Sequence, residues 1–383
     1  MQKPVTLITG YLGSGKTTVM NELLKSQTHK NLAVIVNDMG SINLDADLLK
    51  KNSIAQMDTK MIELQNGCIC CTLREEFMDQ IEQLSDTKEI EAILVEASGI
   101  SNPASLAESF LMYEDKTKNS SVYLNSIVTV VDADRIYHEF LVKMEELQEV
   151  KESAETDTED DPDIINLVMD QIEFCNLIIL NKCDLLTLEE LTQVKTVIKH
   201  LQPEADIIET VQGKVEADLI FHEKRFDYEK VNNSSAIQKA LLREAKADKG
   251  EQKEYGISSF VYEQRNPFDY NAFIEFLELN YPSDIIRAKG YIWFSDDDMH
   301  VQLFEQAGRN SSLTEVSNWI AAFNSEEQKE VFKEYPEVLA EWDDIFGDRD
   351  RMNQIVFIGR DFDEEKIKEQ LDGCTVSYTP LVV

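Results

Sequence analysis

The feature that most constrains this chain is a glycine-rich loop between an expected strand and an expected helix. The loop reads Gly-Tyr-Leu-Gly-Ser-Gly-Lys-Thr-Thr over residues 10–18, follows the apolar residues 5–9 and precedes an amphipathic segment at 19–25. Glycines let the backbone approach an anion closely, and a helix that starts there adds the positive end of its dipole. In this context the pattern is typical of a phosphate-binding P-loop. It predicts a nucleotide site at the carboxyl end of the first strand.

The P-loop pattern also assigns roles to its side chains. We expect Lys16 to reach the β- and γ-phosphates and the Thr17 hydroxyl to hold Mg²⁺. The backbone and small side chains of the loop are expected to supply further nucleotide contacts, at Gly10, Gly13, Ser14, Gly15 and Thr18.

A second strand end carries an acid. Residues 91–99 form an apolar run that ends in Glu96-Ala-Ser-Gly99, which is the Walker B position. A carboxylate there binds Mg²⁺ directly or through water, and the Gly99 amide can reach the γ-phosphate. No glutamine follows Gly99, so we expect slow intrinsic hydrolysis that a metal or a client stimulates.

The residues at a third strand end predict which base the bound nucleotide carries. Residues 177–184 read Leu-Ile-Ile-Leu-Asn-Lys-Cys-Asp. We expect Asp184 to accept two hydrogen bonds from guanine, whose donor pair adenine lacks, while Asn181 supports the base and the Lys182 stem packs over it. GTP and GDP are therefore the expected ligands, and an ATP-dependent kinase is disfavoured. Cys183 is expected to be a half-buried filler.

Strands and helices alternate through the first part of the chain, which predicts an α/β fold with a parallel sheet and helices on both faces. We expect this domain over residues 1–226, with a solvated acidic insertion at about 145–163. Residues 227–256 are polar and are expected to be a linker with one helix.

The remaining residues, 257–383, predict a smaller α+β domain. Strands around two helices suggest a ferredoxin-like split βαβ sheet. We expect the helix that begins near Pro267 to bury Phe273, Phe276 and Leu277. The segment 314–346 is expected to be helical, with Trp319 and Trp342 as core anchors.

The composition excludes some classes of partner. The chain has 383 residues and a formal net charge of −36. Such an acidic surface repels nucleic acid and anionic lipid, so neither is expected to bind. No apolar run approaches the roughly 20 residues of a membrane span, and the first strand begins too early for a signal peptide. We therefore expect a cytoplasmic protein without a membrane partner.

Three of the six cysteines crowd into one loop as Cys68-Ile-Cys70-Cys71, directly after an Asn-Gly turn. Thiolates select Zn²⁺ or Cu(I) over Mg²⁺ and Ca²⁺, so the cluster predicts a thiophilic metal site. Asp38 and water are candidates for the remaining ligands, although Asp38 also suits a turn in which it caps its own backbone. A redox disulfide between Cys68 and Cys71 is the main alternative, and chance clustering is another.

Taken together, these motifs resemble the CobW family of P-loop GTPases, relatives of HypB and UreG. The resemblance is carried by the P-loop, the Gly-Cys-Ile-Cys-Cys segment, Glu96 to Gly99 and the Asn-Lys-Cys-Asp segment, and it extends to a C-terminal domain through residues 287–293, 306–308 and 357–360. It implies a GTP-hydrolysing metallochaperone that delivers Zn(II) to a client metalloprotein, or cobalt for cobalamin synthesis. Asn-Asp-Met-Gly-Ser at residues 37–41 stands where relatives often have Asn-Glu-Phe-Gly-Glu, which leaves fewer acidic ligands here.

Overall fold

The computed structural model describes residues 2–26, 32–36, 60–63, 74–117, 120–142, 162–221, 226–235, 255–308, 310–334 and 350–378. These residues form two compact units, one within residues 2–235 and one within residues 255–378. Each unit is described by itself. Among the described helices, none is long and apolar enough to cross a membrane.

The first unit is built on a seven-stranded sheet in which every pair of neighbouring strands is parallel. The strand order is β3-β2-β4-β1-β5-β6-β7. The strands are β1 (Lys3–Thr9), β2 (Leu32–Val36), β3 (Lys60–Glu63), β4 (Ala92–Glu96), β5 (Val122–Asp132), β6 (Leu177–Asn181) and β7 (Asp206–Glu209). All residues of β2, β4 and β6 are buried, which explains why these strands are continuous apolar runs in the sequence.

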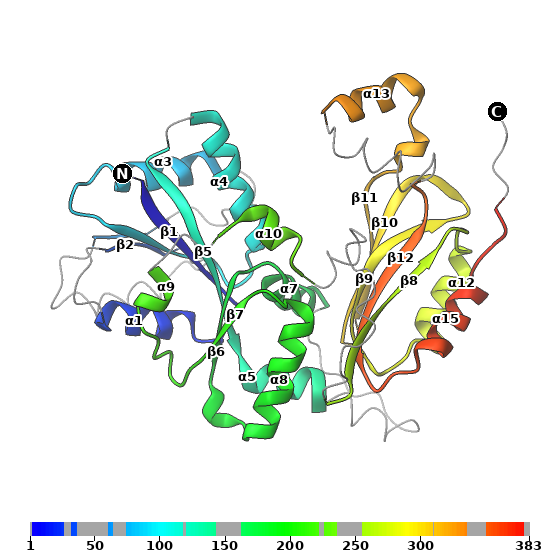
Figure 1. Cartoon of the computed structure of the whole chain (residues 1–383), viewed down its shortest axis with the longest axis horizontal. Coiled ribbons are helices and arrows are strands. Elements are labelled where there is room, and N and C mark those ends of the chain that lie inside the picture. The colour runs from blue at the N-terminus through cyan, green and yellow to red at the C-terminus, as the bar shows by residue number, and fades with distance from the viewer. Residues whose placement is uncertain are drawn as a thin grey trace. The chain divides into compact units, whose positions relative to one another are not determined.

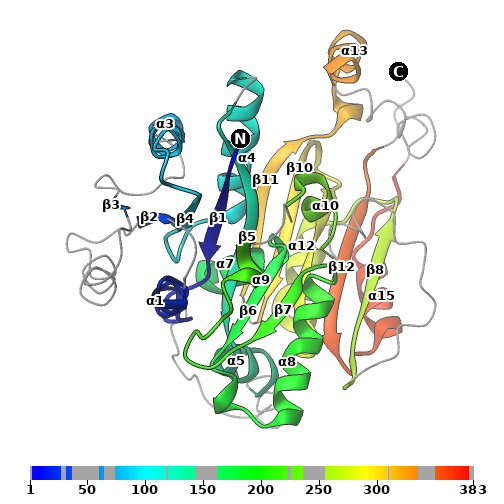
Figure 2. The same ribbon diagram turned by 60° about the vertical axis from the view of Figure 1, so that its left-hand side comes forward.

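Helices cover both faces of this sheet, as the sequence predicts (Figures 1 and 2). On one face α1 (Lys16–Ser26) and α9 (Asp218–Phe221) pack on alternate strand residues such as Ile8, Leu94 and Val130. The other helices in the described part of the unit are α3 (Arg74–Ser85), α4 (Pro103–Thr117), α5 (Ala133–Tyr137), α7 (Pro162–Glu173), α8 (Leu188–Leu201) and α10 (Tyr228–Asn232), with a π-helical turn at His138–Val142 and a 3-10 turn at Cys183–Leu185. Figure 2 shows α1 and α3 on opposite sides of β2 and β4.

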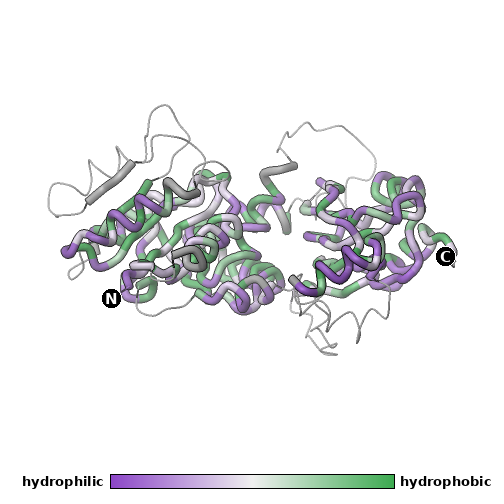
Figure 3. The backbone as a smooth tube through the Cα atoms, turned by 90° about the horizontal axis from the view of Figure 1, so that it is seen from above, coloured by the Kyte–Doolittle hydropathy of each residue, from purple (hydrophilic) through white to green (hydrophobic). Residues whose placement is uncertain are grey.

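The second unit is an antiparallel sheet with helices on one face. Its strand order is β11-β10-β9-β12-β8. The elements are β8 (Ile257–Gln264), α12 (Tyr270–Glu275), a π-helical turn (Phe276–Asn280), β9 (Ile285–Phe294), β10 (Asp297–Ala307), β11 (Asn310–Asn318), a 3-10 turn (Ile320–Ala322), α13 (Ser325–Glu334), β12 (Asn353–Arg360) and α15 (Glu364–Gly373). Hydrophobic and hydrophilic residues alternate along the chain in both units (Figure 3).

The predicted α+β class of the second unit is confirmed. Strands β8 and β9 are joined through α12 but are separated in the sheet by β12, which is the split βαβ arrangement. The sheet has a fifth strand, β11, and α15 follows the last strand, so the element order departs from the βαββαβ order of a ferredoxin-like sheet. Its core is aromatic: Phe273 is fully buried and stacks on Phe268, with ring centroids 5.2 Å apart.

The predicted helical segment 314–346 is only partly confirmed, and several predictions lie outside the described residues. Residues 325–334 of that segment form α13. Residues 314–318 belong to β11 and are not helical, because they extend the antiparallel ladder with β10. Trp319 is buried against Trp293 and Val301, as expected of a core anchor, whereas Trp342 is not among the described residues. Of the predicted acidic insertion, residues 162 and 163 begin α7, and the rest lies outside the described residues.

Candidate nucleotide site

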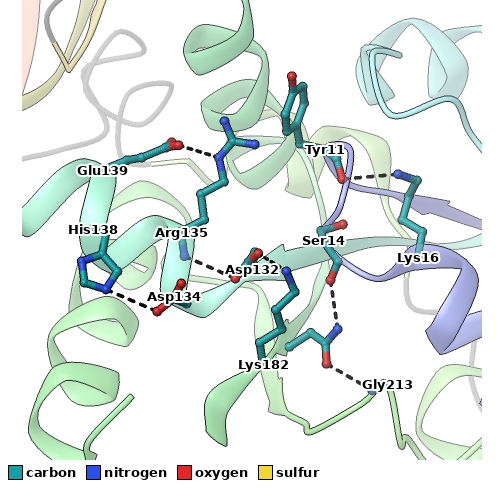
Figure 4. Close-up of polar contacts among 11 residues, drawn as sticks. Tyr11, Ser14, Lys16, Asp132, Asp134, Arg135, His138, Glu139, Lys182 and Gly213 are labelled. Carbon is teal, nitrogen blue, oxygen red and sulfur yellow. Dashed lines mark hydrogen bonds and ion pairs between the residues drawn. The ribbon is translucent and has the colours of Figure 1, made fainter. Parts of the chain in front are cut away.

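The P-loop joins the carboxyl end of β1 to the first turn of α1, as its sequence predicts. Gly10, Gly13 and Gly15 have φ values of 132°, 80° and 103°. Gly15 also needs the absence of a side chain, because a Cβ there would lie 2.3 Å from Nδ2 of Asn181. Lys16 begins α1 and its Nζ donates to the Tyr11 carbonyl at 3.4 Å (Figure 4). The loop is thus a turn of backbone at a helix N-terminus, the arrangement that binds phosphate.

Thr17 and Glu96 meet beside this loop. The Thr17 hydroxyl donates to Glu96 Oε1 at 3.3 Å, and the Glu96 side chain is buried. Strands β1 and β4 are neighbours, so the residues that follow their carboxyl ends lie side by side. A hydroxyl and a carboxylate are the hard oxygen ligands that Mg²⁺ accepts, and therefore this pair fits the expected cation.

Asn181 connects the P-loop with a segment that follows β7. Its Nδ2 donates to the Ser14 carbonyl at 2.9 Å, and its Oδ1 accepts from the Gly213 amide at 3.1 Å. Figure 4 shows this bridge between loops that are far apart in the sequence. The buried Asn181 side chain therefore holds the two loops at a constant separation.

Lys182 and Asp184 follow Asn181 at the same edge of the sheet. Lys182 adopts a left-handed backbone with φ of 61°, and its ammonium pairs with the carboxylate of Asp132 (Figure 4). Asp184 is exposed, so its carboxylate is open to a ligand. Cys183 is half-buried, and burial raises the pKa of its thiol, which agrees with the expected role as a filler.

A further cation lies beside the P-loop. The guanidinium of Arg135, on α5, sits over the ring of Tyr11 at 4.5 Å from its centroid and is paired with Glu139 at 2.7 Å (Figure 4). The stacking fixes the ring of the loop's second residue against α5. Arg135 was not predicted from the sequence.

The predicted thiophilic metal ligands, Asp38, Cys68, Cys70 and Cys71, lie outside the described residues. Within the described residues no group of three or more His, Cys, Asp or Glu side chains is arranged to hold a metal ion. The strands that precede these ligands in the sequence, β2 and β3, pair in parallel with each other, and β2 pairs with β4. Their carboxyl ends therefore point to the same edge of the sheet as the P-loop.

Comparisons with known proteins agree with this architecture. Residues 4–209 match the model of the CobW/HypB/UreG nucleotide-binding domain, and residues 257–375 match that of the cobalamin synthesis protein CobW C-terminal domain. The chain belongs to the CobW/HypB/UreG family. A relative from Dictyostelium discoideum, named zinc-regulated GTPase metalloprotein activator 1, is 31% identical over 394 residues, which cover 99% of this chain and 81% of the relative.

Two other proteins are also similar to this chain. The zinc chaperone CobW of Pseudomonas aeruginosa is 31% identical over 218 residues, covering 55% of this chain and 57% of that protein. The Zn(II)-bound YjiA GTPase of E. coli aligns with a TM-score of 0.42 and 19% identity over 98% of this chain and 100% of that one.

Two parts of the site were missed at the level of sequence. Residues 210–214 follow the short strand β7, which is not predicted from the sequence, and they bring the Gly213 amide to Asn181. Asp132, the last residue of β5, was not among the predicted site residues, yet it pairs with Lys182 and caps α5. A signal for the first part exists in retrospect: the adjacent apolar residues Ile207 and Ile208 are followed within four residues by Gln-Gly.

Proposed function

We propose that this chain is a GTP-hydrolysing metallochaperone that binds Zn(II) and releases it to a client protein according to the bound nucleotide. The observation that carries the proposal is the convergence of strand ends at one edge of a parallel sheet. The P-loop, Glu96 and the Asn-Lys-Cys-Asp segment meet there, and β2 and β3 lead in sequence to Asp38 and to the three cysteines. The name of the Dictyostelium relative supports the same combination of zinc and GTPase activity.

Each residue has a chemical role in this proposal. Lys16 and the loop amides bind the phosphates, and Asp184 selects guanine over adenine. Thr17 and Glu96 would hold Mg²⁺, which neutralises charge on the phosphates. Hydrolysis of GTP by water then yields GDP and phosphate, and no residue in the described part of the chain is assigned to position that water.

Zinc would be the cargo of the cysteine loop. Cys68, Cys70 and Cys71 supply soft thiolate ligands, and Asp38 is proposed as a further one. Because Cys68 comes five residues after Glu63, the end of β3, an extended chain of that length reaches at most about 18 Å. This short spacing supports the proposal that the cysteines act near the edge of the sheet that carries Glu96. In this proposal, the loss of the γ-phosphate changes the affinity of the protein for zinc. By linkage, zinc changes the nucleotide affinity by the same factor.

The test is a zinc titration of the reduced protein with GTP turnover and nucleotide affinity as readouts. We expect zinc to change one of them by at least about fivefold, the lower end of ordinary coupling between sites. Cys70→Ala should abolish this response and keep GTP binding. Asp184→Asn should lose the preference for GTP over ATP and keep zinc binding.

Each alternative has its own outcome in this experiment. If zinc leaves affinity and turnover unchanged, the coupling is refuted. If instead mild oxidant consumes two thiols and changes nucleotide affinity in zinc-free protein, the cysteines form a redox switch. A response to cobalt that zinc does not produce would indicate cobalt delivery.

A further inference from the structure

Gln171, on helix α7, holds the turn that follows the Walker B acid. Its side-chain Nε2 donates to the carbonyl of Gly99 at 3.2 Å and to the carbonyl of Ser101 at 3.1 Å. The residue is 1% exposed. One buried amide therefore binds two carbonyls of the turn whose Gly99 amide is expected at the γ-phosphate.

The main chain of Gln171 is itself fixed to the two central strands. The hydroxyl of Thr129, on β5, donates to the Gln171 carbonyl at 2.7 Å. The hydroxyl of Thr9, the last residue of β1, lies 3.1 Å from that of Thr129. Thr9 directly precedes the P-loop. The buried hydroxyls of Thr129 and Thr9 therefore link the main chain of Gln171 to the start of that loop.

The turn at residues 98–101 lies close to the P-loop. A Cβ on Gly99 would lie 2.9 Å from Cδ2 of Leu12 and 3.1 Å from its backbone nitrogen. The turn is closed by the Ser101 amide, which donates to the Ser98 carbonyl at 2.9 Å. Gly99 thus lies between the P-loop on one side and the Gln171 amide on the other.

A small cavity connects Gln171 with the P-loop directly. It has a volume of about 20 Å³ and is lined by both Ser14 and Gln171. Ser14 Oγ and Gln171 Oε1 are buried and find no hydrogen-bond partner within the described part of the chain. A cavity of this size holds about one water molecule, which would be a partner for a buried oxygen that lines it. Because buried polar atoms are nearly always satisfied, these two oxygens indicate a cavity polar enough to hold that water.

We propose that Gln171 is a positioning residue for GTP hydrolysis, which sets the position of the Gly99 amide and transmits its displacement to helix α7. The inference rests on the proposed GTPase function. When the γ-phosphate engages the Gly99 amide, the Gly99 and Ser101 carbonyls move relative to Gln171. The main chain of Gln171 is bound to Thr129. Helix α7 therefore either moves with the turn, or the two hydrogen bonds from the Gln171 side chain to the Gly99 and Ser101 carbonyls break.

The test compares Gln171→Leu with Gln202→Leu in the full-length protein. Gln202 is an equally buried glutamine whose Nε2 also donates to a main-chain carbonyl, that of Glu173, at 2.5 Å, but it makes no contact with a nucleotide loop. Gln171→Leu should lower kcat for GTP by about tenfold, while the Kd for GDP stays within about threefold of the wild type. Gln202→Leu should keep the wild-type kcat. Thermal unfolding of both variants reports their loss of stability.

Two further readouts separate a positioning role from a structural one. Gln171→Glu should recover activity as the pH falls, because only the protonated carboxyl can donate to a carbonyl. In nucleotide-free protein, hydrogen exchange at residues 98–101 should accelerate by about tenfold in Gln171→Leu and remain unchanged in Gln202→Leu.

Three results would overturn the proposal: an unchanged kcat in Gln171→Leu, an equal fall in kcat in both leucine variants, or unchanged exchange at the turn. A wild-type protein that hydrolyses no GTP would instead refute the proposed function. In that case the exchange measurement still decides whether Gln171 holds the turn.

Discussion

At the scale of single residues, Asp132 makes the contacts that orient the predicted base-binding segment. Its carboxylate pairs with Lys182 and accepts from the Arg135 amide at 3.3 Å, which caps α5. Lys182 has a left-handed backbone that a residue with a side chain adopts at some cost. The ion pair with Asp132, and the hydrogen bond from the Cys183 amide to the Thr210 carbonyl at 3.2 Å, stabilise that conformation.

We predict that Asp132→Asn weakens GTP binding by about fivefold, because the isosteric amide keeps the helix cap but loses the charge that holds the Lys182 ammonium. Asp134→Asn is the matched control, since Asp134 lies in the helix that Asp132 caps and pairs with the exposed His138 at 3.3 Å. Calorimetric titration of the two variants measures the Kd. Equal affinities for both variants and the wild type would contradict a positioning role for Asp132.

At the scale of elements, the ladder between β9 and β10 contains a group of three charges, of which Arg287 is buried and Lys289 and Glu305 are half-buried. Glu305 lies opposite Lys289 in the register of the two strands and contacts its ammonium at 2.8 Å. It also contacts the guanidinium of Arg287, a fully buried side chain, at 3.3 Å. Burial raises the pKa of Glu305, but Lys289 and Arg287 outweigh burial, so the pKa lies below its ordinary value of 4.5.

We predict that this group stabilises the second unit above pH 4.5 and loses its effect in acid. A carboxyl whose pKa is lower in the folded state contributes stability that is lost as the pH falls from 4.5 through the folded value. Glu305→Gln should cost about 3 kcal/mol of unfolding free energy at pH 7, since it leaves the buried Arg287 and the half-buried Lys289 without their charge partner. The difference from the wild type should shrink below pH 4.5 in denaturant unfolding. A difference that is constant with pH would refute the assignment.

At the scale of the whole molecule, the two units have separate hydrophobic cores. The core of the first lies between the parallel sheet and helices that include α1 and α9. The core of the second is rich in phenylalanine, with Phe260 stacked on Phe357 at 5.0 Å between ring centroids. All described residues of the candidate nucleotide site belong to the first unit.

We therefore predict that nucleotide stabilises one part of the chain selectively. In calorimetry of the full chain, a GTP analogue at 100 times its Kd should add about 2.7 kcal/mol to the unfolding free energy of the first unit. The unfolding transition of the second unit should not shift. Lys16→Ala, which removes a phosphate ligand, should abolish the effect. If both transitions shifted equally, the units would unfold as one cooperative body.

Much of the fold and of the candidate site could be predicted from the sequence, because the informative patterns are local. A buried parallel strand requires an apolar run, so β4 and β6 could be predicted from the runs that end at Glu96 and Asn181. The P-loop needs its glycines at set positions, and these positions could be read directly. Residues 314–318 were misassigned as helical, since their exposed polar side chains carry little periodicity and only the pairing with β10 makes them a strand.

By itself the sequence determined the P-loop, the acid at Glu96, the Asn-Lys-Cys-Asp segment and the two-part architecture, because backbone geometry and strand burial restrict which residues can stand at those positions. Only the tertiary structure decided that Asn181 joins Ser14 to Gly213, that Asp132 holds Lys182 and that Gln171 binds the turn at Gly99. These partners are 32 to 167 positions apart in the chain. Their contacts depend on which strands lie side by side, and no local pattern records that order.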